Sequence, residues 1–455
     1  MSVSMVDFDR FLFAFTVGSH ILLVSASITL SILICISEFL SIRYSDRHYR
    51  ALARKLTRVF VVSFGVGTAS GVVMAVELVN LFPGFMTLVS RTGVIAIFYV
   101  EIFAFFIETV FLVVYVYYWN AFRGRYTHWA LSLPVVAGTL FSGVLITMVN
   151  AWMNTPNGFN IGNYIATGQV TDVNPWAPFF TVSTVPEIMH VLSMVVLTGS
   201  MMIGGYFAHG YMKSAGGDAR LLFLKGLRTT AVLAVISIVL TVYTGINEIT
   251  TLLRYQPLKY AAIELNPSPG PGLPERIFGT IAGGKVSGGF GIPGLQGFLV
   301  RVETGIATLP GLSQYPASEW PPLIIHTTFD VMVISALIMG LFLFVFGGMW
   351  IAGKKPYDSR LMSYGLQFFG LFTLLIMELG WVTDELGRQP WIVYNVMKVS
   401  QAASYSGALF VPGVAMIVFY IFLIPFTFCF FVRVFNGKPL ETDLRETSIG
   451  GGVNY

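Results

Sequence analysis

Side chains that can bind metal ions or carry protons lie inside stretches of sequence that are otherwise apolar. These residues are His20, Glu101, Glu108, Glu187, His190, Asp330, Met332, Asp384, Glu385 and Arg388. An ionisable or coordinating side chain is costly within a membrane and indicates a functional site by default. Because histidine nitrogen and methionine sulfur are axial ligands of electron-transfer haem iron, the combination favours haem binding. Each residue alone has a simpler interpretation, since a buried histidine often bonds a neighbouring helix and methionine usually packs in a core.

Other kinds of site match the sequence less well. Zinc needs three or four nitrogen, sulfur or oxygen ligands, often at short spacing, and the sequence contains no such cluster. Cys35 and Cys429 both lie in apolar runs and provide neither a disulfide nor a metal framework. The sequence also lacks a glycine-rich phosphate loop and a serine nucleophile motif. A membrane transporter or ion channel stays open as an alternative, with the carboxylates as its ion site.

The elements that position these residues are membrane-spanning helices. The chain is 55% hydrophobic and 11% charged, whereas a soluble domain carries about 25% charged residues. Stretches long enough to cross roughly 30 Å of hydrocarbon are residues 12–36, 57–80, 94–118, 129–152, 184–207, 221–250, 324–351, 364–383 and 404–433. We therefore expect an all-α integral membrane protein with about nine transmembrane helices in one bundle.

The basic residues predict the orientation of the bundle. Most of the 27 Lys and Arg follow the first, third, fifth and seventh apolar stretches or lie in the C-terminal tail. Since Lys and Arg mark cytoplasmic connections, we expect the N-terminus outside and the C-terminus in the cytoplasm. The formal charge of +4 reflects this asymmetry and does not indicate nucleic-acid binding. In this orientation the candidate residues come from five helices and share the outer leaflet.

A long loop separates the sixth and seventh stretches. The expected organisation is helices one to six in 1–251, an extracytoplasmic loop in 252–323, helices seven to nine in 324–433 and a cytoplasmic tail in 434–455. Loops of this length are usually functional or disordered. The loop begins Gln256-Pro257-Leu258-Lys259-Tyr260-Ala261-Ala262-Ile263-Glu264, a mixture of apolar and charged residues that suits a binding surface. The Gly and Pro content of 266–322 argues against a regular hairpin there.

Two strings of the sequence resemble signatures of a known enzyme family. Gln256-Pro257-x-Lys259-x-Ala261-Ala262-x-Glu264 and Gly387-Arg388-Gln389-Pro390-Trp391 are similar to strings in subunit I of cytochrome bd-type quinol oxidases. Further similar strings follow in order along nearly the whole chain. They are Arg10 ten residues before His20, then 64–67, 104–108, 150–153, His190 with Thr198-Gly199, and 329–333.

The resemblance implies three haems and their ligands. His190 and Met332 are similar to the axial ligands of a low-spin haem b. His20 is similar to the ligand of one of two high-spin haems, a haem b and a haem d, at the oxygen-reducing centre. Glu385 is similar to a carboxylate at that centre. Arg388 and Trp391 belong to the second signature string, where Arg388 would offset haem propionate charge or form a surface ion pair.

The resemblance also implies residues for quinol and for protons. Gln256, Lys259 and Glu264 are similar to residues that bind and oxidise quinol. Glu108, together with Glu101, is similar to an acid pair tied to proton delivery.

Two positions depart from the family pattern. The first glutamate of the acid pair usually lies eight residues before the second, whereas Glu101 lies seven before Glu108. One residue corresponds to about 100° on a helix, so Glu101 could point elsewhere. The well-studied members carry Arg two residues before the methionine ligand, where this chain has Asp330. We expect that change to alter the haem potential and to remove a propionate partner.

The implied activity is respiratory. The enzyme would oxidise quinol at the outer face and reduce O₂ to water, generating a membrane potential without pumping protons. The implied partners are a second membrane subunit, either subunit II-like or a subunit-I-like homologue, and possibly a small one-helix subunit, in a prokaryotic cell membrane. A cyanide-insensitive variant with only b-type haems is an alternative, because no residue separates haem d from a further haem b. A haem-bearing electron carrier without oxygen chemistry is another.

Overall fold

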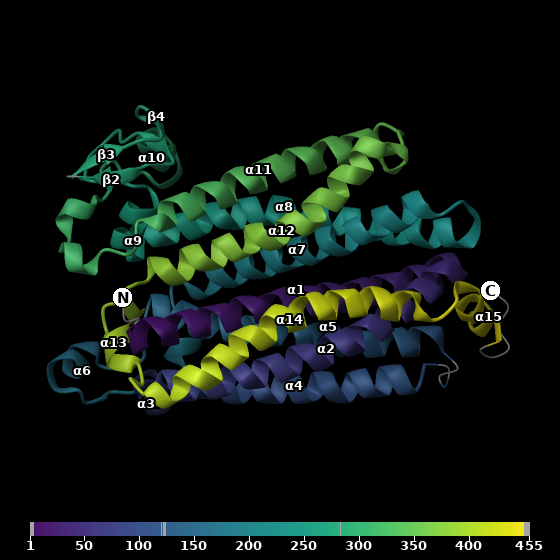
Figure 1. Ribbon diagram of the computed structural model, residues 1–455, viewed down its shortest axis with the longest axis horizontal. Helices are drawn as coiled ribbons and strands as arrows, with labels where there is room; N and C mark the ends of the chain where they lie inside the picture. Colours follow the sequence, from purple (N-terminus) through teal and green to yellow (C-terminus); the bar gives the residue numbers. More distant parts are fainter. Residues whose placement is uncertain (1–3, 120, 122–123, 283, 450–455) are drawn as a thin grey trace.

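The protein is an elongated bundle of long helices, seen in a computed structural model that describes residues 4–119, 121, 124–282 and 284–449 (Figure 1). Within these residues, nine helices are long and apolar enough to cross a membrane. They are α1 (Met5–Tyr44), α2 (Arg47–Leu81), α4 (Val94–Tyr117), α5 (Arg125–Asn154), α7 (Thr184–Lys213), α8 (Gly217–Tyr255), α11 (Ile324–Ile351), α12 (Arg360–Gly387) and α14 (Phe410–Gly437). The all-α membrane fold expected from the sequence is confirmed.

Most of these helices are longer than the apolar stretches that predicted them. The first helix begins at Met5 rather than at residue 12, because the Ser4 hydroxyl accepts a hydrogen bond from the Asp7 amide at 3.1 Å. The carboxylate of Asp46 likewise caps α2 through the amides of His48 and Tyr49. Such caps let polar turns stay helical beyond the hydrocarbon. The last span begins later than expected, since a short 3-10 helix precedes α14.

Short elements connect the spans. The short α-helices are α3 (Pro83–Arg91), α6 (Ile161–Thr167), α9 (Pro257–Ile263), α10 (Leu295–Thr304), α13 (Val399–Ala402) and α15 (Leu440–Ile449). The 3-10 helices are η1 (Ala177–Phe179), η2 (Leu312–Gln314), η3 (Ala317–Glu319), η4 (Pro356–Asp358) and η5 (Gly407–Leu409). The strands are β1 (Glu275–Ile277), β2 (Thr280–Ala282), β3 (Lys285–Ser287), β4 (Phe290–Ile292), β5 (Trp391–Val393) and β6 (Met397–Lys398).

The long loop contains an antiparallel hairpin, so the expectation drawn from its Gly and Pro content was wrong. Pairing of β2 with β3 is nested inside pairing of β1 with β4. Gly288 and Gly289, with φ of 71° and 73°, supply left-handed backbone where β3 gives way to β4. Glycine adopts this conformation without steric cost. The glycines of the loop therefore lie where the hairpin bends.

The two ends of the bundle carry different elements. The N-terminus, α3, α6, α13 and the long loop with α9, α10 and the hairpin lie at one end, and α15 with the C-terminus lies at the other (Figure 1). The apolar core follows the same division. One buried cluster joins α1, α2, α7, α8, α11 and α12, a second includes α3 and β5, and a third lies under the long loop.

Candidate functional site

His190 and Met332 come from helices that pack around a common region. His190 on α7 and Met332 on α11 both belong to helices that pack on α8 and α12. The His190 Nδ1 atom lies 3.2 Å from the Thr244 hydroxyl on α8, which leaves the other ring nitrogen available for a ligand bond. A tautomer fixed by such an outer hydrogen bond is typical of metal-binding histidine.

Glycines leave open space beside both of these side chains. A Cβ atom on Gly245 of α8 would lie 3.2 Å from His190 Cε1, and one on Gly380 of α12 would lie 2.9 Å from Met332 Sδ. The second distance is shorter than real Cβ contacts, so an alanine there would require the Met332 side chain to shift. The two residues and their surroundings therefore fit axial ligation of a flat cofactor with a His/Met pair.

His20 on α1 also fits a ligand role. Its Nδ1 atom is buried and has no hydrogen-bond partner among the described residues. Gly71 of α2 lies against the ring, where an added Cβ would be 3.4 Å from His20 Cε1. A buried polar nitrogen normally has a partner, so its absence here is consistent with a group that the protein chain does not supply.

Two carboxyl groups that the sequence interpretation missed contact α1 within one helical turn of His20. Glu77 on α2 accepts a hydrogen bond from the Thr16 hydroxyl at 3.2 Å. One carboxylate oxygen of Glu378 on α12 faces Gly18, and the other is buried without a partner among the described residues. Both lie within predicted spans, so the rule that intramembrane carboxylates are functional could have found them.

The two glutamates of α4 both face α5. The Thr139 hydroxyl donates to Glu108 at 2.6 Å, and the Ser142 hydroxyl donates to Glu101 at 2.7 Å. The helix is continuous over Val94–Tyr117, so a spacing of seven residues already puts both carboxylates on one face. The doubt about the direction of Glu101 is thereby resolved, since no bulge is needed to bring it to α5.

The C-terminal end of α12 carries a network of charged side chains. The Arg388 guanidinium is 2% exposed and donates to both carboxylate oxygens of Glu385, at 2.8 and 2.7 Å. It also donates to the side-chain oxygens of Asn150 and Asn154. The surface ion pair considered for Arg388 is therefore wrong, because the guanidinium itself is buried. Trp391 follows in β5, with Lys398 over its ring at 5.1 Å.

The first turn of the long loop is buried rather than exposed as a surface. Lys259 is 2% exposed and forms an ion pair with the carboxylate of Asp384, donating also to its backbone carbonyl at 3.1 Å. The Gln256 amide donates to the carbonyl of Asn154 at 3.2 Å. The segment is therefore packed inside the protein and anchored to α5 and α12.

Glu264 points in another direction, toward the loop itself. Its carboxylate accepts a hydrogen bond from the Gln296 amide of α10 at 2.7 Å. Burial raises the pKa of Glu264 to about 8, and the charge of Glu275 in β1 acts in the same direction. The group is therefore mostly protonated at neutral pH and becomes a proton acceptor as the pH rises. Sequence analysis did not identify Gln296, which lies 32 residues away.

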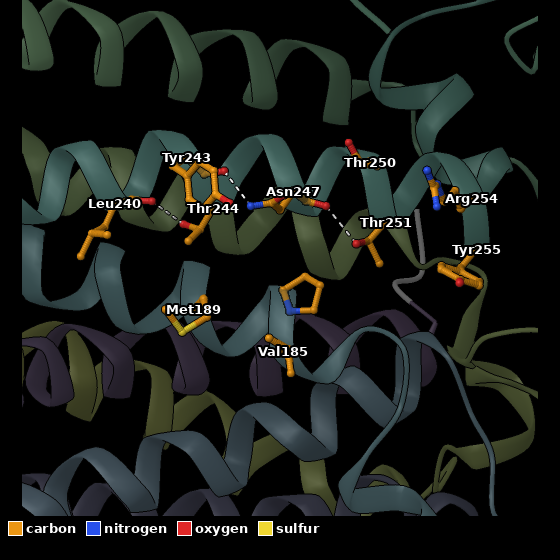
Figure 2. A pocket seen from close by; sticks show the side chains of 11 residues that line it. Val185, Met189, Leu240, Tyr243, Thr244, Asn247, Thr250, Thr251, Arg254 and Tyr255 are labelled. Atoms are coloured by element: carbon orange, nitrogen blue, oxygen red, sulfur yellow. Dashed lines mark hydrogen bonds between the residues drawn. The ribbon is translucent and has the colours of Figure 1, made fainter. Parts of the chain in front are cut away.

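A pocket of about 510 Å³ opens between α7 and α8, beside His190. Val185 and Met189 face it from α7, and residues from Leu240 to Tyr255 face it from α8 (Figure 2). Its lining includes Thr244, the hydrogen-bond partner of His190. Met189, Leu240 and Tyr243 lie with Thr244 at one end of the pocket, and Arg254 and Tyr255 lie at the end near the loop.

The chain is similar to proteins of one family over nearly its whole length. The model of cytochrome bd terminal oxidase subunit I matches residues 8–439. A putative cytochrome bd menaquinol oxidase subunit I from Bacillus subtilis (strain 168) is 31% identical over 450 residues, covering 96% of this chain and 97% of the relative. Cytochrome bd ubiquinol oxidase subunit 1 of the same organism is 25% identical over 472 residues, covering 98% of each.

A solved structure has the same fold. The bd oxidase from Geobacillus thermodenitrificans contains a chain that is 30% identical and superposes with a TM-score of 0.87. The match covers 96% of this chain and 99% of that one.

Proposed function

The chain belongs to the cytochrome bd terminal oxidase subunit I family, and from this membership we propose that it is the haem-bearing catalytic subunit of a respiratory oxidase. Relatives bear the names of menaquinol and ubiquinol oxidases, and the chain is accordingly a quinol oxidoreductase. The proposed reaction takes electrons from membrane quinol at the outer face and reduces O₂ to water. Haem groups, when bound, supply the electron transfer and the oxygen reduction.

His190 and Met332 would hold a low-spin haem b. The observation that supports this is that their helices pack on the same partners, α8 and α12, with a glycine against each of the two side chains. His20 would hold a high-spin haem, and Glu385 would belong to the same oxygen site with Arg388 and Trp391. The second high-spin group would be haem d or a further haem b.

The quinol site would be built around α9. Glu264 would accept a proton from quinol, for which its hydrogen bond to Gln296 holds the carboxylate in one orientation. Lys259 would act by fixing α9 to α12 through Asp384. Gln256, whose amide oxygen is buried without a partner among the described residues, would offer an acceptor to the quinol hydroxyl.

Protons for water formation would come from the cytoplasmic side. Glu108 and Glu101, bonded to Thr139 and Ser142 of α5, would pass them toward the oxygen site. Release of quinol protons outside and uptake of protons inside would generate a membrane potential without pumping. The partners would be a second membrane subunit and a small one-helix subunit, in a bacterial cell membrane.

A spectrum of the purified enzyme tests the proposal. We expect oxygen uptake that depends on quinol, and low-spin haem b bands in the reduced-minus-oxidised spectrum. A band to the red of the haem b bands would identify haem d, and its absence would favour the variant with b-type haems only. His20→Ala should abolish oxygen uptake while the low-spin bands persist. A negative pyridine haemochrome assay would contradict the proposal and favour a transporter.

A further inference from the structure

His326, in the first turn of α11, faces hydrogen-bond acceptors on both of its ring nitrogens. Its Nδ1 lies 2.6 Å from the Ile263 carbonyl, at the end of α9. Its Nε2 lies 3.2 Å from the Phe278 carbonyl, in the loop hairpin, and 3.3 Å from the Asp330 carboxylate. The histidine is 1% exposed, so water does not substitute for these partners.

Only the doubly protonated ring satisfies this arrangement. A neutral imidazole carries one N–H group, and its other nitrogen is an acceptor. Either tautomer would therefore set a nitrogen lone pair against a carbonyl oxygen, whereas the imidazolium donates on both sides. The Asp330 carboxyl group, one helical turn further along α11, faces the same Nε2 atom.

The hairpin residue held by this pair has an unusual backbone. Phe278, between β1 and β2, has φ of 58°, a left-handed conformation that is costly for a bulky side chain. Its N–H donates to the Asp330 carboxylate at 2.5 Å, and its C=O accepts from His326. Gly289 packs so closely that an added Cβ would lie 2.2 Å from the Phe278 oxygen. Strained residues persist where their surroundings hold them, and here both backbone polar groups are held.

The contact with Ile263 also fixes the end of α9, the helix around which the quinol site is proposed. The last carbonyls of a helix lack partners within the helix and need them from elsewhere. His326 provides one for Ile263, the residue directly before Glu264. Met332 lies six residues further along α11. The same side chain therefore ties the proposed proton acceptor to the helix that carries the proposed haem ligand.

We infer that His326 is a positioning residue that, together with Asp330, fixes α9 and the loop hairpin to α11. The role in quinol oxidation rests on the proposed function, whereas the fixing of the loop does not. Glu264 and Glu275 are the other ionisable groups near this pair.

His326→Leu and His326→Gln, compared in the purified oxidase complex, test this inference. Loss of the two hydrogen bonds of His326 should speed tryptic cleavage of the loop about tenfold or more. The quinol KM should rise about tenfold in His326→Leu, more than in His326→Gln, which keeps a donor. The low-spin haem spectrum should persist in both. His209→Leu, at a histidine bonded to Gln367 in α12, is the control and should leave cleavage and KM unchanged.

Unchanged cleavage and unchanged KM in His326→Leu would overturn the inference. If that variant does not accumulate, His326→Gln and the isosteric Asp330→Asn decide by the same two measurements. A wild-type enzyme that does not oxidise quinol would contradict the proposed function, and loop cleavage would still test the attachment of the loop. Faster cleavage with an unchanged KM would show that His326 only stabilises the loop, and would refute its role in positioning α9 for quinol.

Discussion

At the scale of single residues, Glu264 is where burial has the clearest chemical consequence. A buried carboxylate loses hydration, and its charged form becomes unfavourable. The pKa of Glu264 is raised to about 8 for this reason, with Glu275 adding to the effect. Because only the ionised carboxylate can accept a proton from quinol, its acceptor fraction increases as the pH rises toward and through this value.

We expect kcat/KM for quinol in the wild type to rise with pH up to about 8, as Glu264 ionises. Glu264→Gln should lower the rate by roughly 100-fold or more, because a general base is lost, and should abolish this rising limb. Oxygen uptake measured across pH checks both effects. Glu303→Gln, at a loop carboxylate bonded to Thr250, is the matched control and should keep the wild-type profile. A Glu264→Gln profile that still rises as in the wild type would contradict the assignment.

Candidate residues could be predicted from the sequence because ionisable side chains are costly in a membrane. The residues that they contact could not be predicted. The apolar context identified His20, His190, Glu101 and Glu108 from sequence alone. The Lys259–Asp384 pair joins residues 125 positions apart, and only the packing of α9 on α12 brings them together. The sequence did not single out His326, because its two carbonyl partners belong to backbone that sequence patterns do not position.

At the scale of elements, glycine placement controls the space around the proposed low-spin ligands. Gly380 and Gly245 lie on the two helices that face Met332 and His190. A methyl group on Gly380 would press on the Met332 sulfur, and one on Gly245 would press on the His190 ring. Packed interiors transmit such overlaps as shifts of side chains, and a shifted ligand binds iron less well.

We expect Gly380→Ala to weaken haem binding at the Met332 site. Its Cβ would lie 2.9 Å from the sulfur, and overpacking of this kind costs about 1–3 kcal/mol. The low-spin haem content should fall, or its bands should shift, while the high-spin haem persists. Gly348→Ala on α11, where an added Cβ meets nothing within 4 Å, should leave the spectrum unchanged. Equal spectra for both variants would argue against Met332 as the ligand.

Long helices were predictable from sequence, and the hairpin was not. Apolar stretches of sufficient length identify spans because the bilayer leaves no other way to satisfy backbone groups. Helix ends were missed by several residues, since capping by Ser4 or Asp46 depends on polar side chains outside the hydrocarbon. The hairpin was missed because glycine was interpreted as a strand breaker, whereas Gly288 and Gly289 form its bends.

At the scale of the whole molecule, the elements proposed to bind quinol gather at one end of the bundle. The loop, α9 and the charged end of α12 lie at the end that also carries the N-terminus, and α15 lies at the opposite end (Figure 1). The asymmetry of Lys and Arg predicts that the first end faces outward. Quinol protons would then leave on the outer side, which is the condition for generating a potential without a pump.

Protease access checks this orientation. Lys285 and Arg301 in the loop and Arg445 in the tail are all exposed. Because basic residues mark the cytoplasmic side, trypsin added to right-side-out vesicles should cleave the loop and leave Arg445 intact. Inside-out vesicles should give the reverse, and detergent should expose all three sites as the control. Cleavage at Arg445 from the outer face would reverse the orientation, and quinol protons would then be released into the cytoplasm.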